Sequence, residues 1–219
     1  MILYHGSSII VEKPKYGYGK TTNDYGQGFY CTEDPELAKE WACFDKKGGF
    51  INTYSLDTGE LSMLELDEAN VIEWIAILVK HRFVRFSSPV ERRMSEYIIS
   101  HFMPESLDYD IIKGYRADDS YFSYVRAFLS NTISLQQLSQ AMKLGNLGMQ
   151  IFIQSEKAFE RIRFVEADAV PGDEYYSKRM KRDYKAREDY YRLLEESVSE
   201  GIFARDIVGK EMTADELRI

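Results

Sequence analysis

The first segment whose residues could do chemistry lies close to the start of the chain. His5 stands directly before Gly6 in the run Leu3–Ser7, after a short apolar stretch that predicts a strand over residues 2–4. A histidine at a strand end places its imidazole beside an exposed backbone N–H and C=O, and the missing Cβ of Gly6 lets a planar ligand approach that backbone. Taken alone, the segment is more typical of a simple turn after a strand.

The second segment combines paired glycines with aromatic side chains. Gly26 and Gly28 precede two aromatic residues, the second of which is Tyr30, and Trp41 follows eleven residues later. Tyr30 and Trp41 could therefore hold a planar ligand between two rings. Composition alone favours the alternative, in which both side chains belong to the core.

The third segment is a late apolar strand predicted over residues 150–154. Gln150 opens this strand, and Gln154 lies four residues further along on the same face. A polar residue before an apolar strand is common, so the segment indicates no function by itself. The three histidines and two cysteines form neither a C-x-x-C nor an H-E-x-x-H pattern, so we expect no metal site.

A mixed scaffold of class α+β must position these segments, because short strands are interspersed with longer helical stretches. Strands are predicted at residues 2–4, 29–32, 50–56, 61–64, 110–112, 150–154 and 161–166. Helices are predicted from Pro35 and over residues 68–82, 91–102, 120–130 and 135–143, and a long polar helix from 173. The third and fourth strands are expected to pair across the turn-forming run at 57–59.

Composition limits the classes of protein that fit. The 219 residues carry 28 basic and 36 acidic side chains, a net charge of −8, so binding of nucleic acid would need a local basic patch. The best apolar run, residues 71–79, is well short of the ~20 residues of a membrane span. With no leader pattern and only two cysteines, we expect a cytoplasmic protein without a disulfide framework.

The long C-terminal helix leaves a different class of function open, that of an interaction protein. Residues 178–192 contain seven basic and three acidic side chains with interleaved tyrosines, so the helix could bind nucleic acid or an acidic partner. A solvated helix with (i, i+4) ion pairs, such as Asp183 with Arg187, is the favoured interpretation.

In their order and spacing the three segments resemble the ADP-ribosyltransferase superfamily, in its diphtheria-toxin-like branch, whose signature is His, Tyr and then Glu or a substitute. Leu3–Ser7 corresponds to the strand L-W-H-G-S of poly(ADP-ribose) polymerases, and Gly26–Thr32 corresponds to their G-K-G-I-Y-F-A. Trp41 matches a second stacking aromatic residue. Nearly the whole chain is similar to a bacterial family of unknown function in that clan, with a late shared motif at residues 146–159.

The resemblance implies an ADP-ribosyltransferase-like split β-sheet core over residues 1–166, with a helical insertion at about 66–145. A C-terminal helical extension, residues 167–219, would pack on this core. It also implies an NAD-dependent mono-ADP-ribosyltransferase that modifies an unidentified macromolecule, either protein or nucleic acid. Relatives often lie beside a small partner gene, so a bacterial toxin or defence effector with a cognate antitoxin is expected.

The resemblance assigns roles to individual residues. The catalytic signature would consist of His5, Tyr30 and Gln150, and NAD would be bound as a substrate by His5, Gly6, Ser7, Tyr30 and Trp41. In these roles the main chain of Gly6 binds the carboxamide and His5 holds a ribose hydroxyl. Tyr30 and Trp41 enclose the nicotinamide ring, and Gln150 bonds the hydroxyl of the nicotinamide ribose.

Two departures from the family pattern bear on the reaction. Gln150 replaces the glutamate of the polymerising members, so we expect transfer of single ADP-ribose units. Ala38 stands where many relatives carry a serine that contacts the nicotinamide amide. An NAD glycohydrolase, or an NAD-binding or partner-binding module on the same fold, is the alternative.

Overall fold

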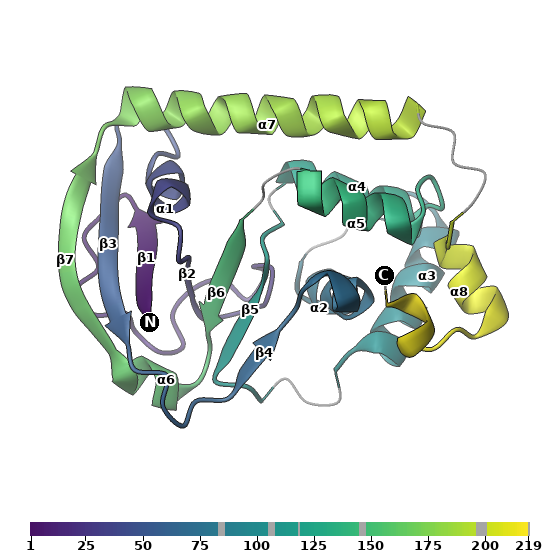
Figure 1. The fold of residues 1–219 in the computed structure, drawn as a ribbon, viewed down its shortest axis with the longest axis horizontal. Coiled ribbons are helices and arrows are strands. Elements are labelled where there is room, and N and C mark those ends of the chain that lie inside the picture. Colours follow the sequence, from purple (N-terminus) through teal and green to yellow (C-terminus); the bar gives the residue numbers. More distant parts are fainter. Residues whose placement is uncertain (83–85, 105–107, 118, 145–147, 196–200, 219) are drawn as a thin grey trace.

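The structure is a computed structural model that describes residues 1–82, 86–104, 108–117, 119–144, 148–195 and 201–218. Within these ranges the chain has a mixed α+β fold with eight α-helices and seven strands in two sheets, which confirms the predicted class (Figure 1). None of the helices in these ranges is both long and apolar enough to span a membrane.

The first sheet contains three antiparallel strands in the order β1-β3-β7, which are β1 (Ile2–Ser7), β3 (Gly49–Leu56) and β7 (Ile162–Val170). The predicted turn at Gly6 is wrong, because β1 continues through Gly6 to Ser7. A Cβ atom at Gly6 would lie 1.8 Å from the carbonyl oxygen of Ala38. The glycine is therefore needed for the close approach of α1 (Pro35–Ala42) to the sheet.

The second sheet contains four strands in the order β2-β6-β5-β4, which are β2 (Phe29–Cys31), β6 (Met149–Ile153), β5 (Ile111–Tyr115) and β4 (Met63–Glu65). The predicted hairpin of residues 50–56 with 61–64 is wrong, since β4 pairs in parallel with β5. The backbone N–H of Ser62 donates to a carboxylate oxygen of Asp110 at 2.8 Å, which directs the chain to β5 instead of back along β3.

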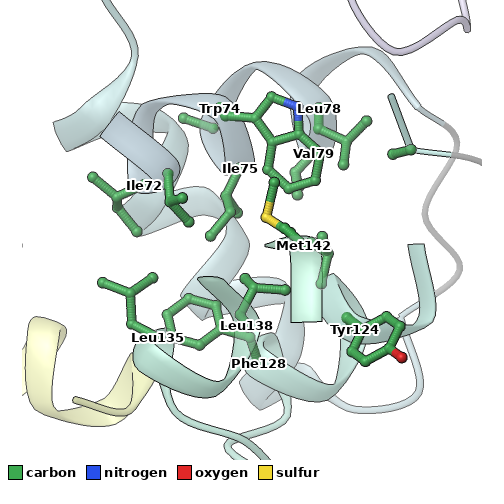
Figure 2. Close-up of a cluster of buried hydrophobic side chains, with 14 of the residues drawn as sticks. Ile72, Trp74, Ile75, Leu78, Val79, Tyr124, Phe128, Leu135, Leu138 and Met142 are labelled. Atoms are coloured by element: carbon green, nitrogen blue, oxygen red, sulfur yellow. The ribbon is translucent and has the colours of Figure 1, made fainter. Parts of the chain in front are cut away.

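The helices beside the second sheet share one apolar core. They are α2 (Val71–His81), which follows a 3-10 turn at Glu68–Asn70, then α3 (Pro89–Phe102), α4 (Asp119–Leu129), α5 (Leu135–Leu144) and α8 (Ala204–Lys210). Figure 2 shows Trp74 and Leu78 of α2 facing Phe128 of α4 and Met142 of α5. Because α2 is buried on almost all sides, it forms the centre of this core.

The helix α7 (Gly172–Glu195) lies along one side of the molecule and connects its two parts (Figure 1). It contacts α1 at one end and both α4 and α5 at the other. Buried Tyr175 anchors the first end, and the Tyr124 hydroxyl donates to the carbonyl oxygen of Ala186 at 2.8 Å. The predicted boundary at residue 166 falls inside β7, which continues to Val170.

Two further elements were not predicted from the sequence. The short helix α6 (Glu156–Arg161) follows β6 and is capped by the Ser155 hydroxyl, which accepts from the backbone N–H of Ala158. The residues predicted as a C-terminal tail contain α8 and a 3-10 turn at Asp215–Leu217, whose buried Ile207 and Leu217 join the helical core.

Candidate functional site

A cavity of about 1140 Å³ lies where β1, β2 and β6 approach one another, with α7 forming another part of its wall. Its lining residues include four side chains from the three sequence segments, namely His5, Tyr30, Trp41 and Gln150. The structure therefore brings together four residues that are up to 145 positions apart in the sequence. The cavity also contains residues that the sequence did not point to.

His5 reaches this cavity from the middle of β1, and its ring is oriented by β2. Its Nδ1 atom lies 2.7 Å from the carbonyl oxygen of Tyr30. A carbonyl can only accept, so Nδ1 carries the proton and Nε2 is left as an acceptor. Burial lowers the pKa of His5, partly opposed by this hydrogen bond, so the ring is neutral at pH 7.

Tyr30 presents its ring to the cavity while its hydroxyl is held by the preceding loop. The hydroxyl donates to the carbonyl oxygen of Gly26 at 2.7 Å and accepts from the backbone N–H of Tyr25 at 3.0 Å. The ring centroid lies 4.8 Å from that of Phe152, which supports it from β6. Burial raises the pKa of Tyr30 well above its usual range. The side chain is therefore an anchored aromatic surface and not an acid or base.

Trp41 contributes a second aromatic surface from α1. Asp34 is the N-cap of this helix, because its carboxylate accepts hydrogen bonds from the backbone N–H groups of Glu36 and Leu37. The indole Nε1 is buried and has no hydrogen-bond partner among the residues that the structure describes. The guanidinium carbon of Arg116 lies 5.3 Å from the ring centroid, a cation–π contact. The Trp41 ring therefore already contacts one delocalised cation.

Gln150 is buried in β6 and its amide is oriented by two acceptors. Its Nε2 donates to a carboxylate oxygen of Asp24 at 3.0 Å and to the carbonyl oxygen of Tyr115 at 3.2 Å. Both amide hydrogens are therefore used, which leaves Oε1 as an acceptor on a residue that lines the cavity.

Asp24 is the functional candidate that sequence reasoning missed. Its carboxylate also accepts from the backbone N–H of Ala117 at 2.9 Å and from Nη1 of Arg82 at 3.1 Å. Burial raises the pKa of Asp24, although these hydrogen bonds and the Arg82 charge act in the opposite direction. A sequence signal did exist, since Asp24 is the only acidic residue between Glu12 and Glu33.

Gly6, Ser7 and Gln154 are not among the residues that line the cavity. Gly6 contacts α1, as described above, and the Ser7 hydroxyl donates to the carbonyl oxygen of Ile9 at 2.5 Å. Nδ2 of Asn52 donates to the Ser7 hydroxyl at 3.1 Å, so this serine helps to hold the loop after β1. The Gln154 amide donates to the carbonyl oxygen of Tyr109, outside the cavity.

The cavity wall is rich in positive charge. Seven cationic side chains line it, which are Lys13, Lys15, Arg82, Arg116, Arg179, Arg182 and Arg187, against the two carboxylates of Asp24 and Asp183. The local balance is 7 − 2 = +5 in a chain of net charge −8. Three of the arginines belong to α7, so the basic helix faces the same cavity as the sequence segments. The predicted ion pair of Arg187 with Asp183 is present at 3.1 Å.

Residues 1–164 match the family model described as "Protein of unknown function (DUF3990)". The chain belongs to the DUF3990 family. No curated protein and no solved structure matches the chain. The DUF3990 match includes His5, Tyr30, Trp41 and Gln150 and ends before α7 begins at Gly172.

No group of three or more His, Cys, Asp or Glu side chains that could hold a metal ion occurs among the described residues of this DUF3990 protein. Both cysteines, Cys31 and Cys43, are buried as free thiols. The cavity itself presents a neutral imidazole, aromatic rings, an amide and the two carboxylates of Asp24 and Asp183.

Proposed function

We propose that this chain is an NAD-dependent ADP-ribosyltransferase that attaches single ADP-ribose units to a macromolecule. The observation that carries the proposal is the convergence of His5, Tyr30, Trp41 and Gln150 on one cavity. These are residues that the resemblance to ADP-ribosyltransferases assigns to the NAD site. The proposal extends to a toxin or defence role with a cognate antitoxin only through that resemblance.

The cavity suits the charge and shape of NAD. The nicotinamide ring of NAD is flat and positively charged, and the faces of Tyr30 and Trp41 attract cations. The basic wall is complementary to the diphosphate of the dinucleotide. Nε2 of His5 can accept a hydrogen bond from a ribose hydroxyl, and Oε1 of Gln150 can accept another.

The reaction needs little beyond orientation and electrostatic support, because NAD carries its own leaving group. The bond from C1′ of the ribose to the ring nitrogen breaks, nicotinamide leaves with the electron pair, and C1′ becomes oxocarbenium-like. Gln150 has no charge of its own. The Asp24 carboxylate accepts a hydrogen bond from Nε2 of Gln150. Its negative charge would therefore act on the reacting carbon through Gln150. Asp24 acts through Gln150 and is a positioning residue.

The test is to incubate the full chain with NAD that carries a labelled nicotinamide or a labelled adenylate. Released nicotinamide measures bond breakage, and the adenylate label recovered in separated protein, DNA and RNA from a lysate identifies transfer. Tyr30→Ala should lose both signals, and Tyr191→Ala, which removes an exposed ring of α7 outside the cavity, should keep them. Nicotinamide release without labelled macromolecule would show an NAD glycohydrolase. Absence of both signals, with no binding of NAD, would refute the proposal.

A further inference from the structure

We propose that the macromolecule modified at this site is a single-stranded nucleic acid, bound at the mouth of the cavity between the loop after β1 and α7. This inference rests on the proposed function, because it names the acceptor for the same reaction. Three features carry it, which are the size of the cavity, its surplus of positive charge and its exposed aromatic rings.

The cavity has room for more than one ligand group. Pockets for small molecules and cofactors usually occupy about 300–1,000 Å³. The cavity of about 1140 Å³ exceeds that range. A group of the acceptor can therefore enter beside a bound dinucleotide, as transfer requires, because the attacking atom has to reach C1′.

The positive charge of the wall exceeds what a dinucleotide diphosphate neutralises. The balance of the lining residues is +5, and it is still +4 after Glu40, which lies 2.7 Å from Arg182, is included. The two negative charges of the dinucleotide diphosphate would leave a surplus of at least two positive charges on the wall. Lys13 and Lys15 belong to the exposed loop, and Arg187 of α7 is largely exposed, so part of the surplus lies at the mouth. Such a surplus attracts an anionic acceptor.

Exposed aromatic rings at the same mouth favour nucleic acid over an acidic protein. Tyr18 and Phe44 both line the cavity and are 77% and 79% exposed. The Arg179 guanidinium carbon lies 4.9 Å from the Phe44 ring centroid. Alternating cations and open rings are the arrangement by which proteins track phosphates and stack unpaired bases. An acidic protein would neutralise the cations but would make no use of the exposed faces of the two rings.

The transfer step balances with this acceptor. The C1′–N bond breaks, nicotinamide leaves with the electron pair, and a base nitrogen of the nucleic acid forms the new bond to C1′. A proton on the attacking atom passes to water. Because bases are accessible only when unpaired, a single strand and not a duplex is expected.

The experiment measures fluorescence anisotropy of labelled single-stranded DNA and RNA of about 20 nucleotides, long enough to cover one binding groove. Duplex DNA and polyglutamate serve as comparison probes, and NAD binding to the parent is titrated separately. Charge reversal at the mouth, Lys15→Glu or Arg179→Glu, is matched with Lys185→Glu, an exposed cation of α7 outside the cavity. Phe44→Ala is matched with Tyr191→Ala.

We expect a single strand to bind with an affinity that falls as salt rises. Lys15→Glu and Arg179→Glu should weaken it about tenfold or more and reduce the salt dependence, whereas Lys185→Glu should change it less than threefold. Phe44→Ala should weaken strand binding by about 5-fold to 100-fold, a stacking-sized loss.

If the protein binds NAD but neither single strand, this inference is overturned and the proposed function stands. Equal losses in the matched variants, or tighter binding of polyglutamate, also overturn it. If the protein binds a single strand but does not bind NAD, the proposed function is overturned instead.

Discussion

The Gln150 amide nitrogen lies 3.0 Å from a carboxylate oxygen of Asp24, although the two residues are 126 positions apart. Under the proposed function, this pair stands where the ADP-ribosyltransferase signature has a glutamate, with the amide from β6 and the carboxylate from the loop before β2. This pairing changes what substitutions at position 150 should do.

Under the proposed function, a glutamate at position 150 should impair NAD turnover. From the sequence alone, Gln150→Glu would retain or raise NAD hydrolysis. In the structure it places two carboxylates within hydrogen-bond distance, which drives one of them to bind a proton and weakens folding. We expect turnover to fall by at least about tenfold and thermal stability to decrease, measured by nicotinamide release and thermal unfolding. The exchange Gln150→Glu with Asp24→Asn should recover most of both losses. Additive losses in the double variant would contradict a direct coupling.

Shortening Gln150 should affect the reaction more than binding. Gln150→Ala removes the acceptor for a ribose hydroxyl and the link to Asp24, so we expect kcat to fall by about 100-fold with little change in NAD affinity. Gln154→Ala is the matched control, because its amide bonds to Tyr109 outside the cavity. If Gln154→Ala is the more damaging change, Gln150 does not occupy the third signature position.

The aromatic rings should report NAD binding directly. Trp41 is half-buried in the cavity wall and Trp74 is 1% exposed, so a fluorescence change on adding NAD should come from Trp41. Tyr30→Ala should weaken NAD binding by about 1–3 kcal/mol, a stacking-sized loss. Tyr30→Phe keeps the ring and should stay within about threefold of the parent. A Trp41→Phe variant that still shows the full signal would contradict this origin.

The buried histidine should make both activity and stability fall in acid. Burial lowers the pKa of His5, so the unfolded chain binds its proton more readily than the folded one. Stability is therefore complete above the usual histidine pKa of about 6.5 and is lost as pH falls through the interval below it. The pKa of His81 is also lowered by burial, so His81 contributes to this loss of stability.

Urea midpoints at pH 7.5 and pH 5 should differ less in His5→Asn and in His81→Asn than in the parent. Protonation of Nε2 should also end its role as an acceptor, so NAD turnover should decline over the same range.

Substitution of Gly6 should act through packing. The added methyl group of Gly6→Ala would meet the Ala38 carbonyl oxygen at 1.8 Å, so α1 would have to move away from β1. We expect a loss of about 1–3 kcal/mol in the free energy of unfolding, typical of overpacking, measured in urea. Gly209→Ala, where an added Cβ meets nothing within 4 Å, should not cause this loss. A stable Gly6→Ala variant that fails only in NAD binding would favour a direct contact with ligand instead.

The existence of most strands and helices could be predicted from the sequence, because periodicity is a local property. The partner of β4 could not, since the bond that directs it joins Ser62 to Asp110 across 48 positions. The same limit applies to the site. Residue types alone favoured core or turn roles for His5, Tyr30, Trp41 and Gln150; the resemblance to ADP-ribosyltransferases singled them out, and the structure places all four on one cavity. The role of Asp24 depends on Gln150, Ala117 and Arg82, which only the folded chain brings near it.

The residues that line the cavity fall on both sides of the point where the DUF3990 match ends. Residues 1–164 supply His5, Tyr30, Trp41 and Gln150, and α7, beyond that point, supplies three of the seven cations. The helix is joined to β7 by a single short connection at Pro171 and packs on the body through few buried side chains. Under the proposed function, a chimera that carries the equivalent helix of another DUF3990 protein should keep the parental cleavage of NAD and change the affinity for the acceptor, because His5, Tyr30 and Gln150 are retained. The helix would then be one part of the acceptor surface that can be exchanged without altering the residues that break the bond.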